Sequence, residues 1–187
     1  MATMTLVEKH DFLKGSAEYK ELDKLCFLSK NLYNARLYTV RQHFFATKKF
    51  LVYSKLTSQF TETNQADYRA FPAKVAQQTL RLINQNFSSF FCTAETESRR
   101  RISRQNTNPE IFTQTERAAS VHYTDQAVSV KVQKGYVHLS QTNIFIKSRV
   151  EKVQFVRVVP RKHKMTVEVG YKRDLPKEKN LSNPRAC

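Results

Sequence analysis

The stretch SAEYKELDKLCFLSKNLYNARLYTVRQHFFA, residues 16–46, repeats apolar side chains every three or four residues. This period is typical of an amphipathic helix with one buried face. The residues on that face are Leu22, Leu25, Cys26, Ser29, Leu32, Tyr33, Leu37, Val40 and Phe44. Ser16 is a favourable N-cap, and Glu18 and Glu21 follow near the positive end of the helix dipole. We therefore predict a helix from Ser16 to about Ala46 whose apolar face, Phe44 included, is core.

A second helix is predicted to begin at Pro72, because proline's fixed φ and missing N–H are harmless in a first helical turn. Its apolar stripe consists of Ala76, Leu80, Ile83, Phe87 and Phe90. A shorter apolar segment at residues 50–60 and a polar loop at Asn64 and Gln65 connect the two helices. Two apolar stripes joined in this way favour a helical hairpin or small bundle.

The second half of the chain alternates apolar and polar residues, as strands do. Val128, Val130 and Val132 alternate up to a turn at Lys134-Gly135, and residues 137–139 continue as the second arm of a hairpin. Further strands are predicted at 144–146, 153–159 and 165–171. Short strands joined by tight turns favour a small antiparallel barrel or sandwich. The fold class predicted is therefore α+β, a helical bundle with a small antiparallel β-barrel.

The charge of the chain points to a polyanionic partner. The sequence has 32 Lys and Arg against 16 Asp and Glu, a formal charge of +16, which favours nucleic acid. No apolar stretch of 18 residues and no apolar signal-peptide core are present, so we expect a soluble, cytoplasmic protein without a membrane partner. Three widely spaced cysteines provide neither a Cys-x-x-C site nor a disulfide framework.

Polar residues follow lines on both predicted helices. Asn31, Asn34, Tyr38 and Arg41 share the face of the first helix opposite its core. Such side chains can reach base edges and phosphates or stack on bases, although a polar outer face is also typical of any amphipathic helix. On the second helix a line without acidic residues could follow a phosphate backbone or could be a solvated face. It consists of Lys74, Gln78, Arg81 and Gln85.

Arginines cluster after the second helix, at Arg99, Arg100 and Arg101, with Arg104 close by. They could neutralise phosphates or act as a charged tether. Catalytic patterns are missing: the five histidines have no metal-ligand spacing, and glycine only at 15, 135 and 170 allows no phosphate-binding loop. Glu168 is a single carboxylate on a predicted strand, and two-metal phosphodiester cleavage needs several.

Several segments of the chain together resemble the TnpB (OrfB) proteins of insertion sequences. The similar segments are residues 22–26, 29–34, 41–42, 72–80, 87 and 89–91 in the predicted helices, and 135–139, 142–144, 146–147, 156–160, 167–169 and 171 in the predicted strands. TnpB proteins are RNA-guided DNA endonucleases in which a helical recognition domain is inserted in a wedge-like β-barrel, before a RuvC-like nuclease. The resemblance implies binding of guide RNA and of a target-adjacent DNA motif, with Tyr53, Lys74 and Gln78 at that motif.

On this basis we expect five regions: residues 1–15 as an N-terminal strand of the barrel, 16–94 as the helical domain, 95–120 as a basic linker, 121–173 as the barrel and 174–187 as a linker. The chain departs from the family in ending at Cys187, without the RuvC carboxylates and the Cys-x-x-C zinc finger. We therefore expect no enzyme activity and no cofactor, with Mg²⁺ and Zn²⁺ belonging to a missing C-terminal half. The family's basic stretch is poorly reproduced between Glu95 and Arg117.

The prediction is a truncated transposase-like protein that binds DNA and RNA in transposition, a form of DNA recombination. The sequence leaves its oligomeric state open. A stand-alone basic RNA-binding protein is the alternative, and a complete nuclease is a third reading that the missing carboxylates oppose.

Overall fold

The computed structural model describes residues 3–100, 119–130, 135–150 and 152–174, without the side chains of residues 83, 88 and 90–100. A strand, β1 (Thr3–Leu13), leads into four helices: α1 (Ala17–Thr47), α2 (Tyr53–Glu62), α3 (Ala66–Arg69) and α4 (Ala73–Arg100). The later elements are β2 (Val121–Thr124), a 3₁₀ turn η1 (Asp125–Ala127), β3 (Val128–Ser129), β4 (Tyr136–Leu139), β5 (Phe145–Lys147), β6 (Val153–Pro160) and β7 (Lys164–Asp174). The predicted α+β class is confirmed.

Helix α1 forms as its sequence predicts, because Ser16 caps it and one face is apolar. The Ser16 hydroxyl accepts a hydrogen bond from the Tyr19 backbone N–H at 3.0 Å. The helix ends where Lys48 takes a left-handed conformation and its N–H donates to the Phe44 carbonyl. Phe44 itself corrects the prediction, because 39% of it remains exposed. The buried face of α1 ends at Val40, so the ring of Phe44, one turn later, is only partly covered.

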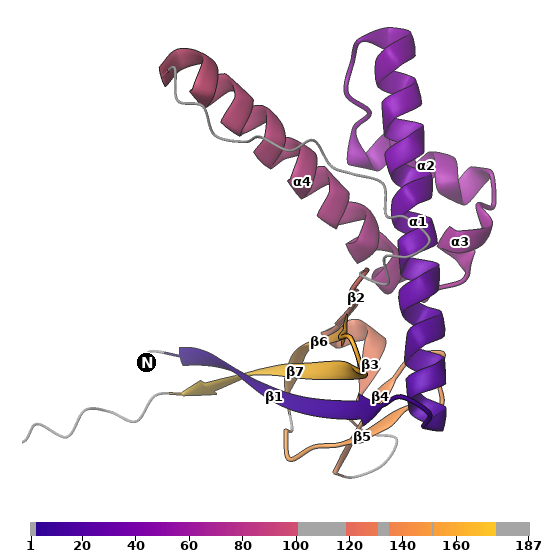
Figure 1. Ribbon diagram of the computed structural model, residues 1–187, viewed down its shortest axis with the longest axis vertical. Helices are drawn as coiled ribbons and strands as arrows, with labels where there is room; N and C mark the ends of the chain where they lie inside the picture. The colour runs from indigo at the N-terminus through magenta and orange to yellow at the C-terminus, as the bar shows by residue number, and fades with distance from the viewer. Residues whose placement is uncertain (1–2, 101–118, 131–134, 151, 175–187) are drawn as a thin grey trace, which may run out of the picture.

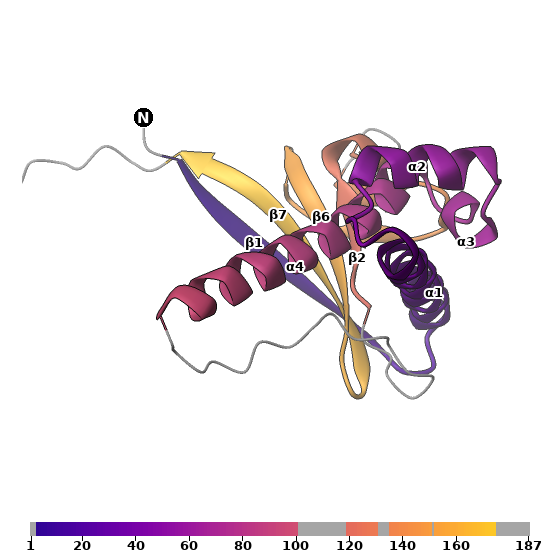
Figure 2. The same cartoon turned by 90° about the horizontal axis from the view of Figure 1, so that it is seen from above.

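Helices α2 and α3 connect α1 to α4 through a compact path. Phe60 of α2 meets Tyr68 of α3 edge to face, with ring centroids 6.2 Å apart. Pro72 lies directly before α4, and its carbonyl accepts hydrogen bonds from the Val75 and Ala76 N–H groups, so the predicted start of the second helix is confirmed to within one residue. Helix α4 packs on α1 near the sheets and diverges from it farther away (Figures 1 and 2). It continues to Arg100, past the expected domain boundary at residue 94.

The strands form two antiparallel sheets. The order is β1-β7-β6-β2 in one and β3-β4-β5 in the other. The predicted hairpin is confirmed, since Val128 of β3 pairs with Leu139 of β4. The expected closed barrel is wrong for the described residues, because neither sheet pairs its first strand with its last. Closure requires a register stagger that a local alternating pattern does not specify.

The first and last described strands pair along their whole length. Thr3 lies opposite Asp174 and Leu13 opposite Lys164, in one unbroken antiparallel register. In the sequence, helices α1 to α4 therefore lie between β1 and β7, two strands that are neighbours in one sheet. A single apolar core joins Leu22 and Leu25 of α1 and Leu80 of α4 to Tyr123 and Val158 of the sheet. The remaining expected linker, residues 101–118, and the C-terminal one, from residue 175, lie outside the described residues.

Gly170 gives a stability test of the sheet. Gly170 of β7 pairs with Phe155 of β6, beside a register shift in β6, and a methyl group on Gly170 would overlap the Phe155 ring. We expect Gly170→Ala to destabilise the protein by roughly 1–3 kcal/mol, the usual cost of overpacking. Thermal and urea unfolding would measure this loss, with Thr5→Ala, at an exposed site on β1, as the control. A second variant, Gly170→Ala with Phe155→Leu, should recover part of the loss; no recovery would contradict the overlap.

Candidate nucleic-acid interface

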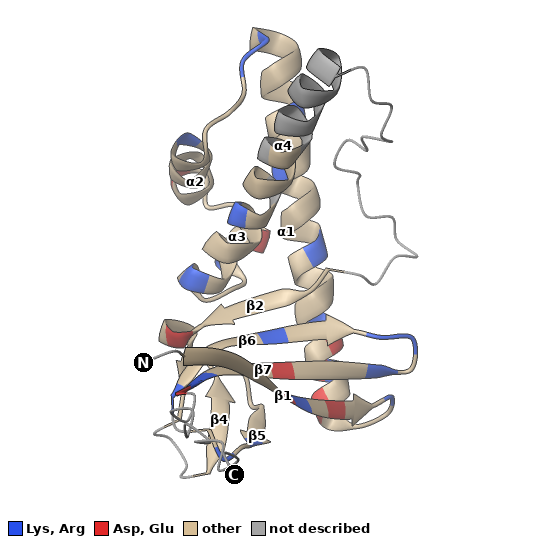
Figure 3. Ribbon diagram, turned by 90° about the vertical axis from the view of Figure 1, so that its left-hand side faces the viewer, with Lys and Arg blue, Asp and Glu red and all other residues tan. Residues whose placement is uncertain are grey.

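Positive charge over residues 24–94, which make up most of the helices, is not balanced by acidic residues. Residues 24–94 contain ten Lys and Arg and only two acids, Glu62 and Asp67, an excess of +8. The two acids lie at the end of α2 and in α3. Among the residues that are described, the other acidic positions in Figure 3 lie on the strands, in the turn after β2 and at the start of α1. Residues 24–94 are therefore a continuous positive stretch that would attract a polyanion.

The predicted line on α4 lies on one outward side of the helix. Lys74, Arg81 and Gln85 are exposed and Gln78 is half-buried. They follow each other at intervals of four, three and four residues, so they share one face of the helix. Val75 and Ala76 of the same helix are buried, and they pack toward the core. No acidic residue occupies the first turn of α4, where Lys74 lies near the positive end of the helix dipole.

Tyr53 joins this line from the first position of α2. The guanidinium carbon of Arg81 lies 5.7 Å from the centroid of the Tyr53 ring, within the range of a cation–π interaction. Of the residues expected from the TnpB resemblance, Tyr53 is thus tied to the α4 line through Arg81, and Lys74 and Gln78 stand on the line itself. We call Tyr53, Lys74, Gln78, Arg81 and Gln85 the α4 surface.

Arg36 of α1 was not predicted as a functional residue, and it lies beneath the α4 surface. It is fully buried, and none of its three side-chain nitrogens has a hydrogen-bond partner among the residues that the structure describes. Its guanidinium carbon also lies 5.7 Å from the Tyr53 ring centroid. Burial lowers the pKa of Arg36 to about 10, while Tyr53 and Tyr33 act in the opposite direction. The side chain therefore remains a cation at neutral pH, and two cations flank the Tyr53 ring.

The signal for Arg36 in the sequence was its position. It follows Leu32 by four residues and precedes Val40 by four, so it lies on the apolar face of α1. A charged residue at such a position is buried only at a substantial desolvation cost. The aromatic faces nearby provide part of its compensation.

The second predicted line lies on α1, away from the Tyr53 contacts. Tyr38 is 62% exposed, and Asn31, Asn34 and Arg41 are half-buried. These residues share one side of α1, as their spacing predicts. The contacts of the Tyr53 ring with cations run instead to Arg36, on the buried face of α1, and to Arg81. The predicted residues therefore fall on two different surfaces.

The predicted arginine cluster lies mostly outside the described residues. Arg99 and Arg100 lie in the last turn of α4, but their side chains are outside the described residues, as are Arg101 and Arg104 entirely. Ile83 and Phe90 of the predicted α4 stripe also lie outside the described side chains, whereas Ala76, Leu80 and Phe87 are buried as predicted.

Glu168, the one strand carboxylate that the sequence singled out, has a structural partner. It is buried in β7 and accepts hydrogen bonds from the Arg157 guanidinium of β6, with an Nε to Oε2 distance of 2.8 Å. His122 of β2 lies opposite Arg157 on the other side, and Lys9 of β1 lies opposite Glu168. The carboxylate thus belongs to a cross-strand row of charged and polar residues, which stabilises a sheet when opposite charges face each other.

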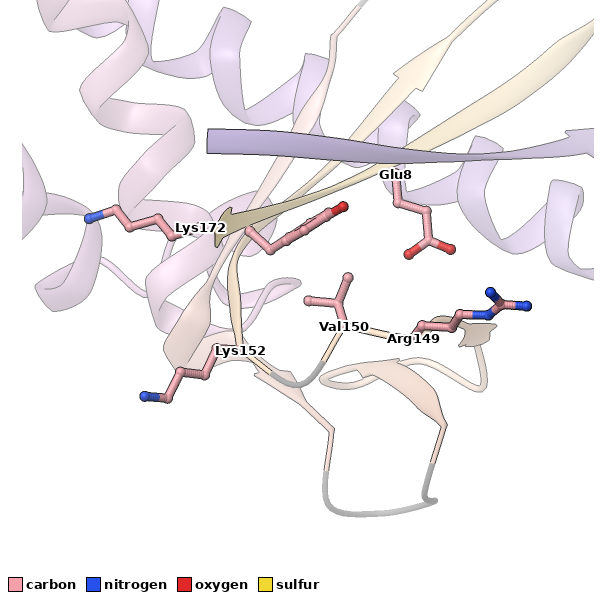
Figure 4. A pocket seen from close by; sticks show the side chains of 6 residues that line it. Glu8, Arg149, Val150, Lys152 and Lys172 are labelled. Carbon is pink, nitrogen blue, oxygen red and sulfur yellow. The ribbon is translucent and has the colours of Figure 1, made fainter. Parts of the chain in front are cut away.

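A cavity of about 610 Å³ opens beside β1 and β7. Its walls include Glu8, Arg149, Val150, Lys152, Tyr171 and Lys172. The Glu8 carboxylate is already engaged by the Ser148 hydroxyl at 2.7 Å. Figure 4 shows Lys152 and Lys172 extending to one side and Arg149 to the other. The three cations do not converge on a point, so the cavity provides no common site for one anion.

Metal-binding groups and membrane-spanning helices are absent from the described residues. These residues contain no group of three or more His, Cys, Asp and Glu side chains that could hold a metal ion. None of the helices, over the portion that can be described, has the length and apolar character needed to cross a bilayer. Cys26 is a buried free thiol, and burial raises its pKa to about 12, which makes it a core side chain and not a nucleophile at neutral pH.

Comparison with known proteins adds no assignment. No model of a known protein family matches the chain, and no curated protein sequence matches it.

The cross-strand row predicts a pH dependence of stability. Burial lowers the pKa of His122 below its ordinary value of 6.5, and Arg157 adds to this while Glu168 opposes it. As the pH falls, the imidazole of the unfolded chain takes up a proton before that of the folded protein does. The free energy of unfolding that depends on neutral His122 is therefore fully present above about pH 6.5 and is lost as the pH falls further. Urea unfolding between pH 7.5 and 5.5 should show a smaller loss for His122→Gln than for the unchanged protein. His163→Gln, at an exposed turn, should keep the original dependence; equal slopes for all three proteins would exclude His122 as the cause.

Proposed function

We propose that this chain is a nucleic-acid-binding, TnpB-like transposase protein that holds DNA and a guide-type RNA during DNA transposition. The observation that carries the proposal is the α4 surface, where Lys74 and Arg81 accompany Tyr53 and two glutamines, with none of the described acids among them. The expected partners are DNA and RNA. The buried thiol of Cys26 suits a reducing compartment such as the cytoplasm.

The chemistry of the α4 surface fits a DNA backbone with limited readout of bases. Lys74 and Arg81 would neutralise phosphates and release condensed counterions. Glutamine amides can bind adenine through two hydrogen bonds in the major groove, which is the role we assign to Gln78. Arg36 adds a fixed charge under Tyr53 that no acid among the described residues neutralises, and this charge strengthens the field at the surface.

The order of the elements supports the assignment to the TnpB family. The resemblance implies a helical recognition domain inserted in a β-domain, and here all four helices lie between β1 and the other strands, with β1 paired to β7. We infer that the helices and sheets act together as a clamp on nucleic acid. The proposed activity is binding, and metal-dependent DNA cleavage by the purified chain would contradict it.

Lys74→Ala tests the electrostatic part of the proposal. If Lys74 contacts a phosphate, its loss removes one released counterion, which makes the slope of log K against log salt less steep by about 0.9 and weakens duplex binding roughly 8-fold at 0.1 M salt. Fluorescence anisotropy with labelled duplex DNA over a salt series measures both quantities. Lys162→Ala removes the same charge from the exposed turn between β6 and β7 and should change them less. If both variants change the salt slope and the affinity equally, the effect comes from net charge, and Lys74 does not contact the DNA.

Gln78→Ala tests the readout of bases. We expect the variant to discriminate less between base pairs at the position that Gln78 contacts, by about 1–3 kcal/mol. Selection from randomised duplexes followed by sequencing measures this discrimination. The salt dependence should stay the same, because the amide is neutral. Gln59→Ala on α2, an exposed glutamine away from this line, is the control. An unchanged preference would remove Gln78 from the interface.

A further inference from the structure

The outer face of α1 carries three exposed aromatic rings in a row. Phe27 is 56% exposed, Tyr38 62% and Phe45 64%. They are 11 and 7 residues apart, close to three and two whole helical turns, so all three rings stand on one side of the helix. At 1.5 Å per residue the row is about 27 Å long. The core residues Leu22, Leu32 and Leu37 of the same helix are fully buried, so this row is not part of the core face.

Polar groups occupy the positions between the rings. In chain order the line reads Phe27, Asn31, Asn34, Tyr38, Arg41 and Phe45, at intervals of four, three, four, three and four residues. Flat apolar faces therefore alternate with amides and a guanidinium. Phe45 also meets Phe44 edge to face, with centroids 6.3 Å apart, and this contact fixes the ring while leaving most of it exposed.

The electrostatic setting of this row favours an anion. No acidic residue occurs from Lys24 to Thr61, across the rest of α1 and nearly all of α2. The Lys30 ammonium lies 4.9 Å from the centroid of the Phe27 ring, although Lys30 is itself buried, and Asp23 precedes this line by one helical turn. A partner that fits must combine negative charge with flat groups at intervals, which are the properties of a nucleic-acid strand.

The strand must be unpaired for its bases to stack on side chains. A protein-docking face would instead gather its apolar residues into one continuous patch, whereas amides and a guanidinium separate these rings. We propose that the outer face of α1 binds an unpaired nucleic-acid strand, with bases stacked on Phe27, Tyr38 and Phe45. Asn31, Asn34 and Arg41 contact its backbone or base edges. This surface is distinct from the α4 surface, to which duplex DNA was assigned above, and it gives an unpaired strand a binding face of its own.

The central test replaces Tyr38 in two ways. Tyr38→Trp keeps an aromatic face, while Tyr38→Leu keeps apolar bulk without one. Affinity for labelled unpaired DNA and RNA homopolymers is measured by fluorescence anisotropy on the full chain. We expect Tyr38→Trp to bind at least as well as the unchanged protein, and Tyr38→Leu, Phe27→Ala and Phe45→Ala each to bind roughly 5- to 100-fold more weakly, the usual range for loss of one stacked base. The salt slope should be unchanged in all four, because no charge is removed.

Phe145→Ala provides the matched control, because Phe145 is a partly exposed aromatic residue on β5, in the three-stranded sheet, and is not part of the row on α1. Thermal unfolding of each variant checks that these exposed substitutions leave the fold intact. If the aromatic variants lose affinity for both unpaired DNA and unpaired RNA, the row recognises bases in general. If they lose affinity for RNA alone, the 2′-hydroxyl contributes to recognition.

Three results would overturn the proposal: equal binding by Tyr38→Trp and Tyr38→Leu, unchanged binding by the two Phe→Ala variants, or self-association of the chain in sedimentation that these variants abolish. The last result would identify the row as a contact between copies of the protein. Duplex binding separates this proposal from the function above. If Lys74→Ala weakens duplex binding while the aromatic variants leave single-strand binding unchanged, only the α1 proposal fails, and the reverse outcome removes only the α4 surface.

Discussion

The antiparallel pairing of β1 with β7 is the constraint on which the other features depend. It brings together residues near the two ends of the described chain, and side chains reinforce it: the Asp11 carboxylate accepts hydrogen bonds from Lys164 and Thr166, at 2.6 and 2.7 Å. These contacts lower the pKa of Asp11. Because β1 ends at Leu13 and α1 begins at Ala17, the ladder also fixes the point from which α1 leaves the sheet.

Charged side chains are paired in the sheets, whereas the helices bury a cation without an acidic partner among the described residues. In the sheets, acidic residues lie against basic ones on neighbouring strands, as Glu168 lies against Arg157 and Asp11 against Lys164. In the helices, Arg36 is buried beside the Tyr53 ring, and its guanidinium has no hydrogen-bond partner among the described residues. A charge buried in this way costs stability unless something compensates it. The apolar core that runs without interruption from the helices into the sheet offsets this cost and lets the helical surface keep its positive charge.

Local periodicity was sufficient to predict α1, α4 and most strands, because each depends on residues close together in the sequence. The same reasoning identified the lines on α1 and α4. It did not identify β2, which pairs with β6 more than 30 positions later in the chain, or the open sheets, because both depend on partners that are distant in the sequence. Arg36 and its contact with Tyr53 were missed for the same reason: the ring comes from another helix, 17 positions later. Phe44 was expected in the core because a helical period does not reveal where the supporting neighbours end.

The exposed end of α1 has a mechanical consequence. The helix has 31 residues, about 46 Å of rigid rod, and its last buried residue is Val40. Because the helix is packed as far as Val40, only its last seven residues, about 10 Å of rod, extend beyond the core. A ligand that strains the β1–β7 ladder could therefore tilt α1 only by moving the helices packed against it as well, so such a strain would reach the whole helical part of the protein.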